Sequence, residues 1–325
     1  MPGFTTHYIF GMKAYNDMPF TPIKHTIAKY RWLDQLGLQG PDMFFYNIPI
    51  LRHRDYRNVG SYMHEHKVNA FFECCLRRIG TIRSRQQQEE AISYLAGFIN
   101  HYIADSICHP YVYGRIGYPV DAPTSMHHGM HAHLENELDA ILLWKYKKKK
   151  PSEFNQTATI CLNGQEIQFI SHFLASCINE TYYPITYRNN FQVTPAMVHR
   201  SIWALRFGCR TLSDKNGKKK FGIAQVESIF VNHPVASAKM VTDSVTDYRS
   251  SCNLNHEAWS NPWDPTRVST ASFVDLFHET LDKCSRVYAL LNSAVTDNMP
   301  LDKQDLSPLL AELGNESYHS GLPVD

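Results

Sequence analysis

The feature that most constrains this chain is a pair of histidine and carboxylate strings with helical spacing. His101, Asp105 and His109 recur every four residues, and His131 and Glu135 are again four residues apart. Positions four apart drift by only about 40° around a helix, so each string projects from nearly one face. Both strings lie in apolar sequence that is typical of a buried helix. The sequence therefore predicts two adjacent helices that face each other across a buried cluster of ligand side chains.

The rest of the sequence predicts a mainly α-helical protein, because apolar residues recur at helical spacing and strand signals are few. Helices are predicted at residues 61–78, 88–108, 130–144, 168–179, 194–209 and 272–291. Pro110 predicts that the helix carrying the first string ends at His109-Pro110. One segment, 157–169, has β-forming residues on both sides of Asn163-Gly164, the pattern of a small β-hairpin insertion.

A length of 325 residues fits one large domain or two small ones, and no internal repeat divides the chain. We expect a single domain over residues 1–325, with a metal-binding half at about 1–150 and a helical half at about 165–295. The stretch 296–325 is polar and punctuated by proline and glycine, which predicts a flexible tail.

Composition excludes several classes of function and location. The 32 basic and 31 acidic side chains provide no electrostatic argument for binding nucleic acid or an anionic membrane surface. The eight cysteines form no CxxC pair, and several lie in apolar helical sequence, as reduced core cysteines do. Neither a secretory signal nor a run of 18 apolar residues is present. We therefore expect a cytoplasmic protein without a transmembrane segment.

The residue types in the two strings predict a zinc site. Imidazole nitrogen and carboxylate oxygen are ligands that zinc prefers. Asp105 stands between two histidines and has two oxygens, so it is the natural bridge between two ions. A lone histidine on an apolar helix is usually an ordinary core residue. Two strings in one buried frame favour a metal centre, because so much unpaired buried polarity would otherwise cost several kcal/mol.

The chain resembles the zinc-dependent phospholipase C family, relatives of the bacterial phosphatidylcholine-hydrolysing phospholipase C and, more distantly, of the fungal zinc-dependent single-strand nucleases. The resembling segments are THYIFG around His7, GLQGPDMFFY around Asp42, GSYMHEHK around His64, HYIADSICHP and HAHLENELDAIL. A later stretch, NLNHEAWSNPWDP followed by SFVDLF, is similar to the C-terminal signature of the family's intracellular bacterial branch. The resemblance implies an all-α, multi-helix phospholipase C/nuclease-like bundle.

The resemblance also implies two or three zinc ions and their ligands. One zinc would take Asp42, His64, His101 and the bridging Asp105, a second would take His109, His131 and Glu135, and a third would take His7 and share Asp105. In the secreted prototype an amino-terminal tryptophan completes the third site. No tryptophan precedes His7 in this chain, so we expect a weaker third site.

Two more residues are predicted to support these ligands. Asp139 continues the second string by one turn and is expected to hold a ligand histidine in one tautomer. His256, within the C-terminal signature, is expected to lie near the site. The isolated histidines, His319 among them, are predicted to be ordinary residues.

The predicted chemistry is hydrolysis of a phosphoester by metal-activated water. The resemblance implies that Asp42 doubles as general base, and the absence of a GxSxG motif agrees with a mechanism that needs no covalent enzyme intermediate. The family default is cleavage of a phospholipid headgroup. Met43 stands where the phosphatidylcholine-hydrolysing branch has an aromatic residue, which predicts little preference for choline. A soluble phosphoester substrate, a nuclease- or nucleotidase-like phosphatase, and a metal-stabilised scaffold without catalysis remain alternatives.

Overall fold

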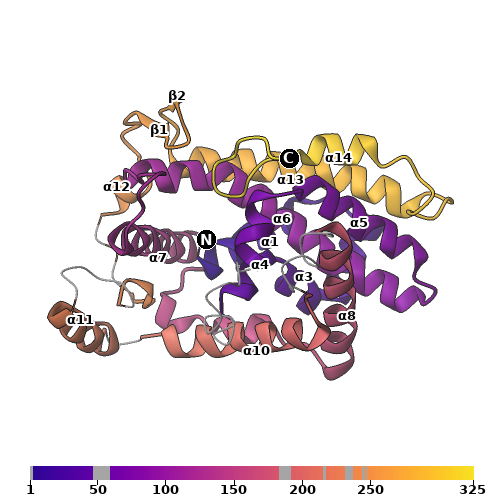
Figure 1. The fold of residues 1–325 in the computed structure, drawn as a ribbon, viewed down its shortest axis with the longest axis horizontal. Helices are drawn as coiled ribbons and strands as arrows, with labels where there is room; N and C mark the ends of the chain where they lie inside the picture. The colour runs from indigo at the N-terminus through magenta and orange to yellow at the C-terminus, as the bar shows by residue number, and fades with distance from the viewer. Residues whose placement is uncertain are drawn as a thin grey trace.

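The computed structural model describes residues 3–46, 59–182, 192–214, 217–230, 237–243, 245 and 247–325. In these residues the fold is almost entirely helical, as predicted, with one two-stranded antiparallel sheet (Figure 1). The elements in chain order are α1 (Phe4–Asp17), α2 (Pro22–Lys29), α3 (Arg31–Gly37), η1 (Gly40–Tyr46), α4 (Val59–Glu65), α5 (Val68–Thr81), α6 (Arg85–Arg115), α7 (Ser125–Lys147), η3 (Pro151–Glu153), η4 (Gln156–Thr159), α8 (Gly164–Thr181), α10 (Pro195–Leu212), α11 (Lys218–Phe230), η5 (Ser237–Lys239), α12 (Tyr248–Ser251), β1 (Trp259–Asn261), β2 (Asp264–Ser269), α13 (Phe273–Thr296) and α14 (Ser307–Leu313).

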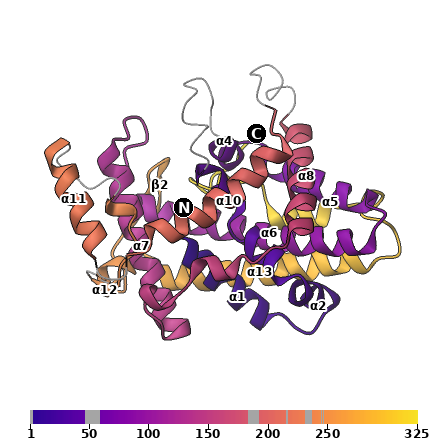
Figure 2. The same ribbon diagram turned by 90° about the horizontal axis from the view of Figure 1, so that it is seen from below.

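Helix α6 is the central element of the fold. Between Glu90 and Tyr113 it is buried on nearly every side, because apolar side chains occupy most of its surface apart from the face that carries the ligand string. Helices from both halves of the chain pack against it, including α1, α2, α3, α7 and α13. Helix α13 runs along one edge of the molecule and α10 along the opposite edge, where the view from below shows it crossing the near face (Figures 1 and 2).

Two glycines allow α3 and α6 to cross at very short range. A Cβ atom on Gly97 would lie 2.0 Å from the carbonyl oxygen of Asp34, and one on Gly37 would lie 2.1 Å from the α6 backbone. Any side chain at either position would therefore force the helices apart. The crossing places the carbonyl of Leu38, just after α3, within 3.0 Å of the ring of His101 on α6.

The predicted helices of the second half are present. Residues 168–179 lie within α8, 194–209 correspond to α10, and 272–291 lie within α13. Thr194 and Ser272 cap α10 and α13 as side-chain acceptors, and Asp275 completes a capping box at the start of α13. None of the helices in the described residues is long and apolar enough to cross a membrane.

Two predicted helix boundaries in the first half are wrong. Helix α6 does not end at Pro110 but continues to Arg115, because packing on all sides outweighs the one backbone hydrogen bond that proline removes. The single helix predicted over 61–78 is instead two helices, α4 and α5. The break falls at Lys67, whose φ of 48° is left-handed and interrupts the helical path.

The predicted β-hairpin at 157–169 is also wrong. Asn163 is the N-cap of α8, where its side chain accepts a hydrogen bond from the backbone of Glu166, and Glu166 accepts one from the backbone of Asn163. This capping box uses the same Asn-Gly pair that a hairpin turn would use. The small sheet lies elsewhere, in β1 and β2.

The stretch 296–325 is packed rather than loose, which differs from the flexible tail that its polarity predicted. It contains helix α14, which packs against α13 and α5. Five of its apolar side chains are buried: Leu301, Leu306, Leu309, Leu313 and Tyr318. Sparse apolar side chains are enough here because each one enters a core built by the preceding helices.

Candidate metal centre

Helix α6 supplies one continuous face of ligand side chains, as its spacing predicts. His101, Asp105 and His109 are fully buried. Asp105 lies between the two histidines, with Oδ2 3.1 Å from Nε2 of His101 and Oδ1 3.7 Å from Nδ1 of His109. The carboxylate therefore lies between the two rings, with the ring of His101 closer.

Three other elements add side chains around His101 and Asp105. Nε2 of His7, on α1, lies 3.2 Å from Oδ1 of Asp105, and Nε2 of His64, on α4, lies 3.2 Å from Oδ1 of Asp42, on η1. The ligand atoms of His7, Asp42, His101 and Asp105 lie within 4.8 Å of one another. These four residues together with His64, which lies beside Asp42, are called the first ligand group: His7, Asp42, His64, His101 and Asp105.

Helix α7 faces the other end of the α6 string. Ligand atoms of His109, His131 and Glu135 lie within 4.8 Å of one another, and we call these residues the second ligand group. Oε1 of Glu135 lies 2.7 Å from Nε2 of His131 and 3.5 Å from Nε2 of His109. The two helices thus meet at the metal-ligand strings, which agrees with the predicted arrangement.

Backbone carbonyls orient three of the histidines. In each case Nδ1 donates to a carbonyl, so that in the neutral ring Nε2 is the unprotonated nitrogen and is free to bind a cation. The pairs are His64 with Gly60 at 2.7 Å, His101 with Leu38 at 3.0 Å and His109 with Tyr318 at 2.7 Å.

The polar atoms that converge here fit a bound cation. Among the described residues, the following buried atoms have no hydrogen-bond partner: both ring nitrogens of His7, Oδ1 of Asp42, Nε2 of His64, Nε2 of His101, both carboxylate oxygens of Asp105 and Nε2 of His109. Each unpaired buried polar group costs about 1–3 kcal/mol, so this many in one place is strongly unfavourable unless they share a partner. Imidazole and carboxylate donors are a suitable set for zinc.

Charges differ between the two groups. Burial by itself would raise the pKa of Asp105, but His109, His101 and His7 outweigh it and hold that pKa well below its usual range. In the second group burial raises the pKa of Glu135 well above its usual range and lowers the pKa of His109 to about 3. The first group is therefore anionic at neutral pH, whereas the second carries little charge until a cation binds.

A comparison with known proteins identifies the family. The family model for zinc-dependent phospholipase C matches residues 6–186, which is more than half of the chain. The chain belongs to the zinc-dependent phospholipase C family. No curated protein and no solved structure matches it significantly. Family membership, together with the two buried ligand groups, supports a metal-dependent phosphoesterase at the level of the family.

Asp139 does not hold a ligand histidine in this member of the zinc-dependent phospholipase C family. Its carboxylate accepts hydrogen bonds from the backbone N–H groups of Thr5 at 3.1 Å and Thr6 at 2.7 Å. These are free donors at the first turn of α1, so Asp139 caps the helix that carries His7. Its effect on the metal centre is through the position of α1, which depends on a contact between helices far apart in sequence.

His256 does not support the ligands either. Its ring contacts the carbonyl of Thr270 at 3.0 Å and lies 3.7 Å from the carboxylate of Asp275, at the exposed start of α13. It therefore belongs to the turn before α13. The C-terminal signature that contains His256 instead places Trp263 near the second group, where its ring lies 4.9 Å from that of Tyr113.

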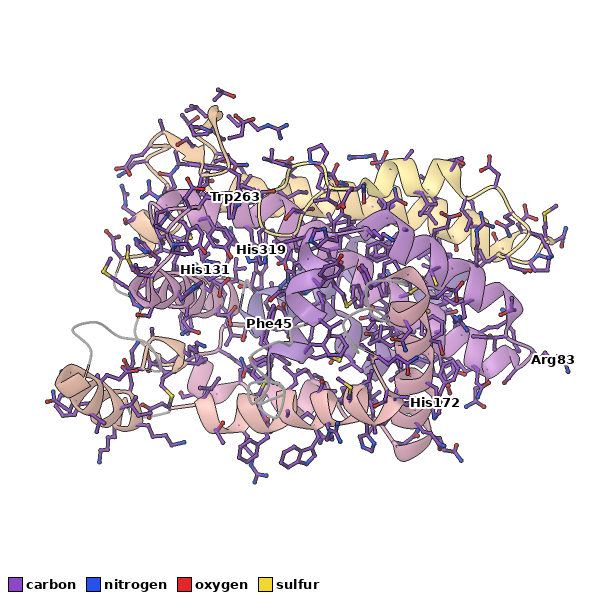
Figure 3. The ribbon with its side chains drawn as sticks, in the orientation of Figure 1. Phe45, Arg83, His131, His172, Trp263 and His319 are labelled. Atoms are coloured by element: carbon purple, nitrogen blue, oxygen red, sulfur yellow. The ribbon has the colours of Figure 1, made fainter. Side chains whose placement is uncertain are left out.

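Sequence reasoning missed four aromatic residues around the ligands: Tyr113, Trp263, Tyr318 and His319. The ring of Tyr113 lies 4.5 Å from His131 and 4.9 Å from Trp263. Figure 3 shows His131, His319 and Trp263 in the same region of the molecule, and Phe45 lies below them in that view. Tyr113 was detectable in principle, because it extends the four-residue string of α6 by one turn. The others had no local signal.

Proposed function

We propose that this protein is a zinc-dependent phosphoester hydrolase of phospholipase C type. The observation that carries the proposal is the presence of two adjoining ligand groups along α6, together with buried polar atoms that lack hydrogen-bond partners among the described residues. A single structural ion would not need two adjoining groups of this kind. Paired sites of this kind are typical of enzymes that cleave phosphoesters.

The ligand assignment follows the geometry. Asp42, His64, His101 and Asp105 would hold one zinc, and His109, His131 and Glu135 would hold another. His7 lies beside the first ion's ligands, and it would hold any third ion together with Asp105. Bound zinc supplies such a reaction with an acidified water and with Lewis-acid stabilisation of the phosphoryl oxygens.

Asp42 is our candidate for the general base. Burial by itself would raise its pKa, but neighbouring His101 and His64 outweigh burial and keep that pKa below the usual range. Asp42 is thus ionised at neutral pH, and its Oδ1, which lacks a hydrogen-bond partner among the described residues, can orient a water molecule and accept its proton.

The expectation of little choline preference rests on Met43, which is buried in the core. The ring of Phe45 lies 5.4 Å from that of His64 instead, and Tyr113 and Trp263 lie on the side of the second group. Aromatic faces next to the ligands would suit a headgroup with a cationic or planar part. We propose a phosphodiester with such a headgroup as the preferred substrate class.

The test has two stages. Metal content is measured by mass spectrometry on natively purified protein, and hydrolysis is then measured for a soluble phosphomonoester, a soluble phosphodiester and phosphatidylcholine micelles at varied zinc. His101→Ala is compared with His172→Ala, an exposed histidine on α8 that Figure 3 shows well away from His131. We expect chelation and His101→Ala to abolish hydrolysis and His172→Ala to preserve it.

The same assay separates the alternatives. Protein that contains zinc but hydrolyses none of the three substrates would favour the metal-stabilised scaffold. Hydrolysis of the phosphomonoester alone would favour a phosphatase. Protein without bound zinc, manganese or iron, whose melting temperature is unchanged by chelator, would show that the ligand assignment is wrong.

A further inference from the structure

The end of the chain reaches the metal centre although it lies outside the matched residues 6–186. We call residues 316–325 the C-terminal segment. It contains Tyr318, which is 1% exposed, and His319, and it lies against both ligand groups. No local pattern in these residues indicates a role in the site.

The backbone of Tyr318 connects one histidine of each ligand group. Its carbonyl accepts the hydrogen bond from Nδ1 of His109 at 2.7 Å, and its N–H donates to the carbonyl of His64 at 2.9 Å. The first contact fixes the tautomer of His109 and directs Nε2 at the second group. The second ties α4, which carries His64, to the same residue.

The ring of His319 extends this connection. It stacks on the ring of His64 at a centroid distance of 4.8 Å and an interplanar angle of 14°, and it lies 5.7 Å from the ring of His109. The hydroxyl of Tyr113 and Nδ1 of His319 are 3.2 Å apart, which is within hydrogen-bond distance. His319 therefore restrains the imidazole of His64 by stacking on its ring.

A glycine docks the C-terminal segment onto α6. Gly321 has a φ of +60°, and a Cβ atom there would lie 2.5 Å from the carbonyl oxygen of Ser106 and 3.1 Å from Pro110. Pro110 has no N–H to donate to the carbonyl of Ser106, four residues earlier, so this carbonyl lacks its usual helical hydrogen bond. Only glycine at position 321 allows the segment to approach the carbonyl so closely. The carbonyl of Ser320, next to Gly321, also accepts a hydrogen bond from the side chain of Asn261 at 2.7 Å.

We propose that the C-terminal segment is a wall of the metal centre that sets how tightly both ligand groups hold zinc. Tyr318 and His319 act as positioning residues, through the orientation of His109 and His64. The inference deepens the proposed function and rests on its zinc assignment, but it concerns metal retention and does not require that any particular substrate is cleaved.

The test uses a pair of glycine substitutions in the full-length protein. Gly321→Ala introduces a methyl group against Ser106 and displaces the segment. Gly117→Ala is the matched control, because Gly117 has almost the same φ, +61°, but nothing lies within 4 Å of the added Cβ. Both variants carry the same backbone strain. Zinc affinity is measured for each ion by competition with a chelator, and the melting temperature is measured after zinc is removed.

We expect Gly321→Ala to weaken zinc retention by about tenfold or more, which is the usual effect of losing a group that orients a metal ligand. Gly117→Ala is expected to retain zinc like the wild type. A second pair covers the case in which Gly321→Ala fails to fold. His319→Ala should weaken retention at the first ligand group, and His319→Phe, which keeps a ring on His64, should restore most of it.

The result that overturns the proposal is unchanged zinc affinity in both Gly321→Ala and His319→Ala. An equal loss in Gly321→Ala and Gly117→Ala also overturns it, because backbone strain alone would then explain the effect. Turnover is recorded separately. A wild type that holds zinc but hydrolyses nothing contradicts the proposed function alone, whereas a wild type that holds no zinc contradicts both.

Discussion

The two ligand groups contain the same types of donor but differ in charge. In the first group Asp42 and Asp105 both have lowered pKa values and are ionised at neutral pH. In the second group the only carboxylate, Glu135, has a raised pKa, because burial outweighs the charges around it. Two buried carboxylates attract a dication much more strongly than one. We therefore expect the first group to hold its ion more tightly than the second.

The two groups also differ in what supports them. Two histidines of the first group are oriented by carbonyls: His64 by Gly60 within α4, and His101 by Leu38 at the close crossing of α3 and α6. The second group depends on Tyr318, more than 200 residues beyond His109, and its His131 retains 9% exposure. The comparison indicates that a ligand set read from local spacing can still depend on distant segments for its geometry.

The largest expected effect comes from Asp105, which lies between the two groups. Asp105→Ala should release the ion of the first group, to which it belongs, and weaken the second, since its Oδ1 lies 3.7 Å from the ring of His109. We expect turnover to fall by about 10³-fold or more, as when a residue central to a catalytic unit is removed. Metal content and turnover are measured in parallel with the His172→Ala control. Retention of one full ion by Asp105→Ala would show that the groups are independent.

A smaller effect should follow from Glu135→Gln, which keeps the side-chain volume but removes the only carboxylate of the second group. We expect this variant to lose the second ion and to keep the first. Stoichiometry by native mass spectrometry should fall by one zinc per chain. Loss of all zinc would mean that the first group cannot hold an ion by itself.

The metal-free protein should show effects of opposite sign for the two carboxylates. The folded-state pKa of Glu135 is raised, so its stabilising contribution is complete below the unfolded pKa and is lost as the pH rises through the folded value. Asp105 has a lowered pKa, so its contribution is present above the unfolded pKa and is lost only in acid. Each titrating proton changes stability by about 1.4 kcal/mol per pH unit between the two pKa values.

Chelated variants test this contrast by denaturant unfolding across pH 5–8. Glu135→Gln should be more stable than the wild type toward pH 8, and Asp105→Asn should be less stable throughout the range. The same sign for both substitutions would contradict the proposed difference in charge.

The smallest expected effect concerns the support of His7. Asp139→Ala leaves two N–H groups of α1 without their acceptor, at a cost of about 1–2 kcal/mol. Asp275→Ala removes a more exposed cap from α13 and is the control. Unfolding of the chelated proteins should show a loss in both, smaller for Asp275→Ala, but only Asp139→Ala should weaken zinc binding, by a few-fold. Equal zinc affinity in the two variants would show that the position of α1 does not affect the first group.

The ligand strings could be predicted from sequence because a helix converts spacing into direction. Four-residue spacing is enough to place His101, Asp105 and His109 on one face, and the apolar sequence around them is enough to bury that face. The resemblance supplied His7, Asp42 and His64, which have no periodic pattern of their own. Predictions of this kind need only local geometry or a known motif.

Tertiary structure decided what local signals leave ambiguous. Asn163-Gly164 suits a hairpin turn or a helix cap, and only the surrounding helices select the cap. Pro110 interrupts a helix unless packing holds it, and here packing does. The position that we propose for His319 depends on the close approach of Gly321 to Ser106 and Pro110 of α6. These outcomes depend on contacts between residues far apart in the chain, whose free energies no local pattern contains. The sequence by itself therefore predicted which side chains come together in the two ligand groups, and the fold decided what orients them.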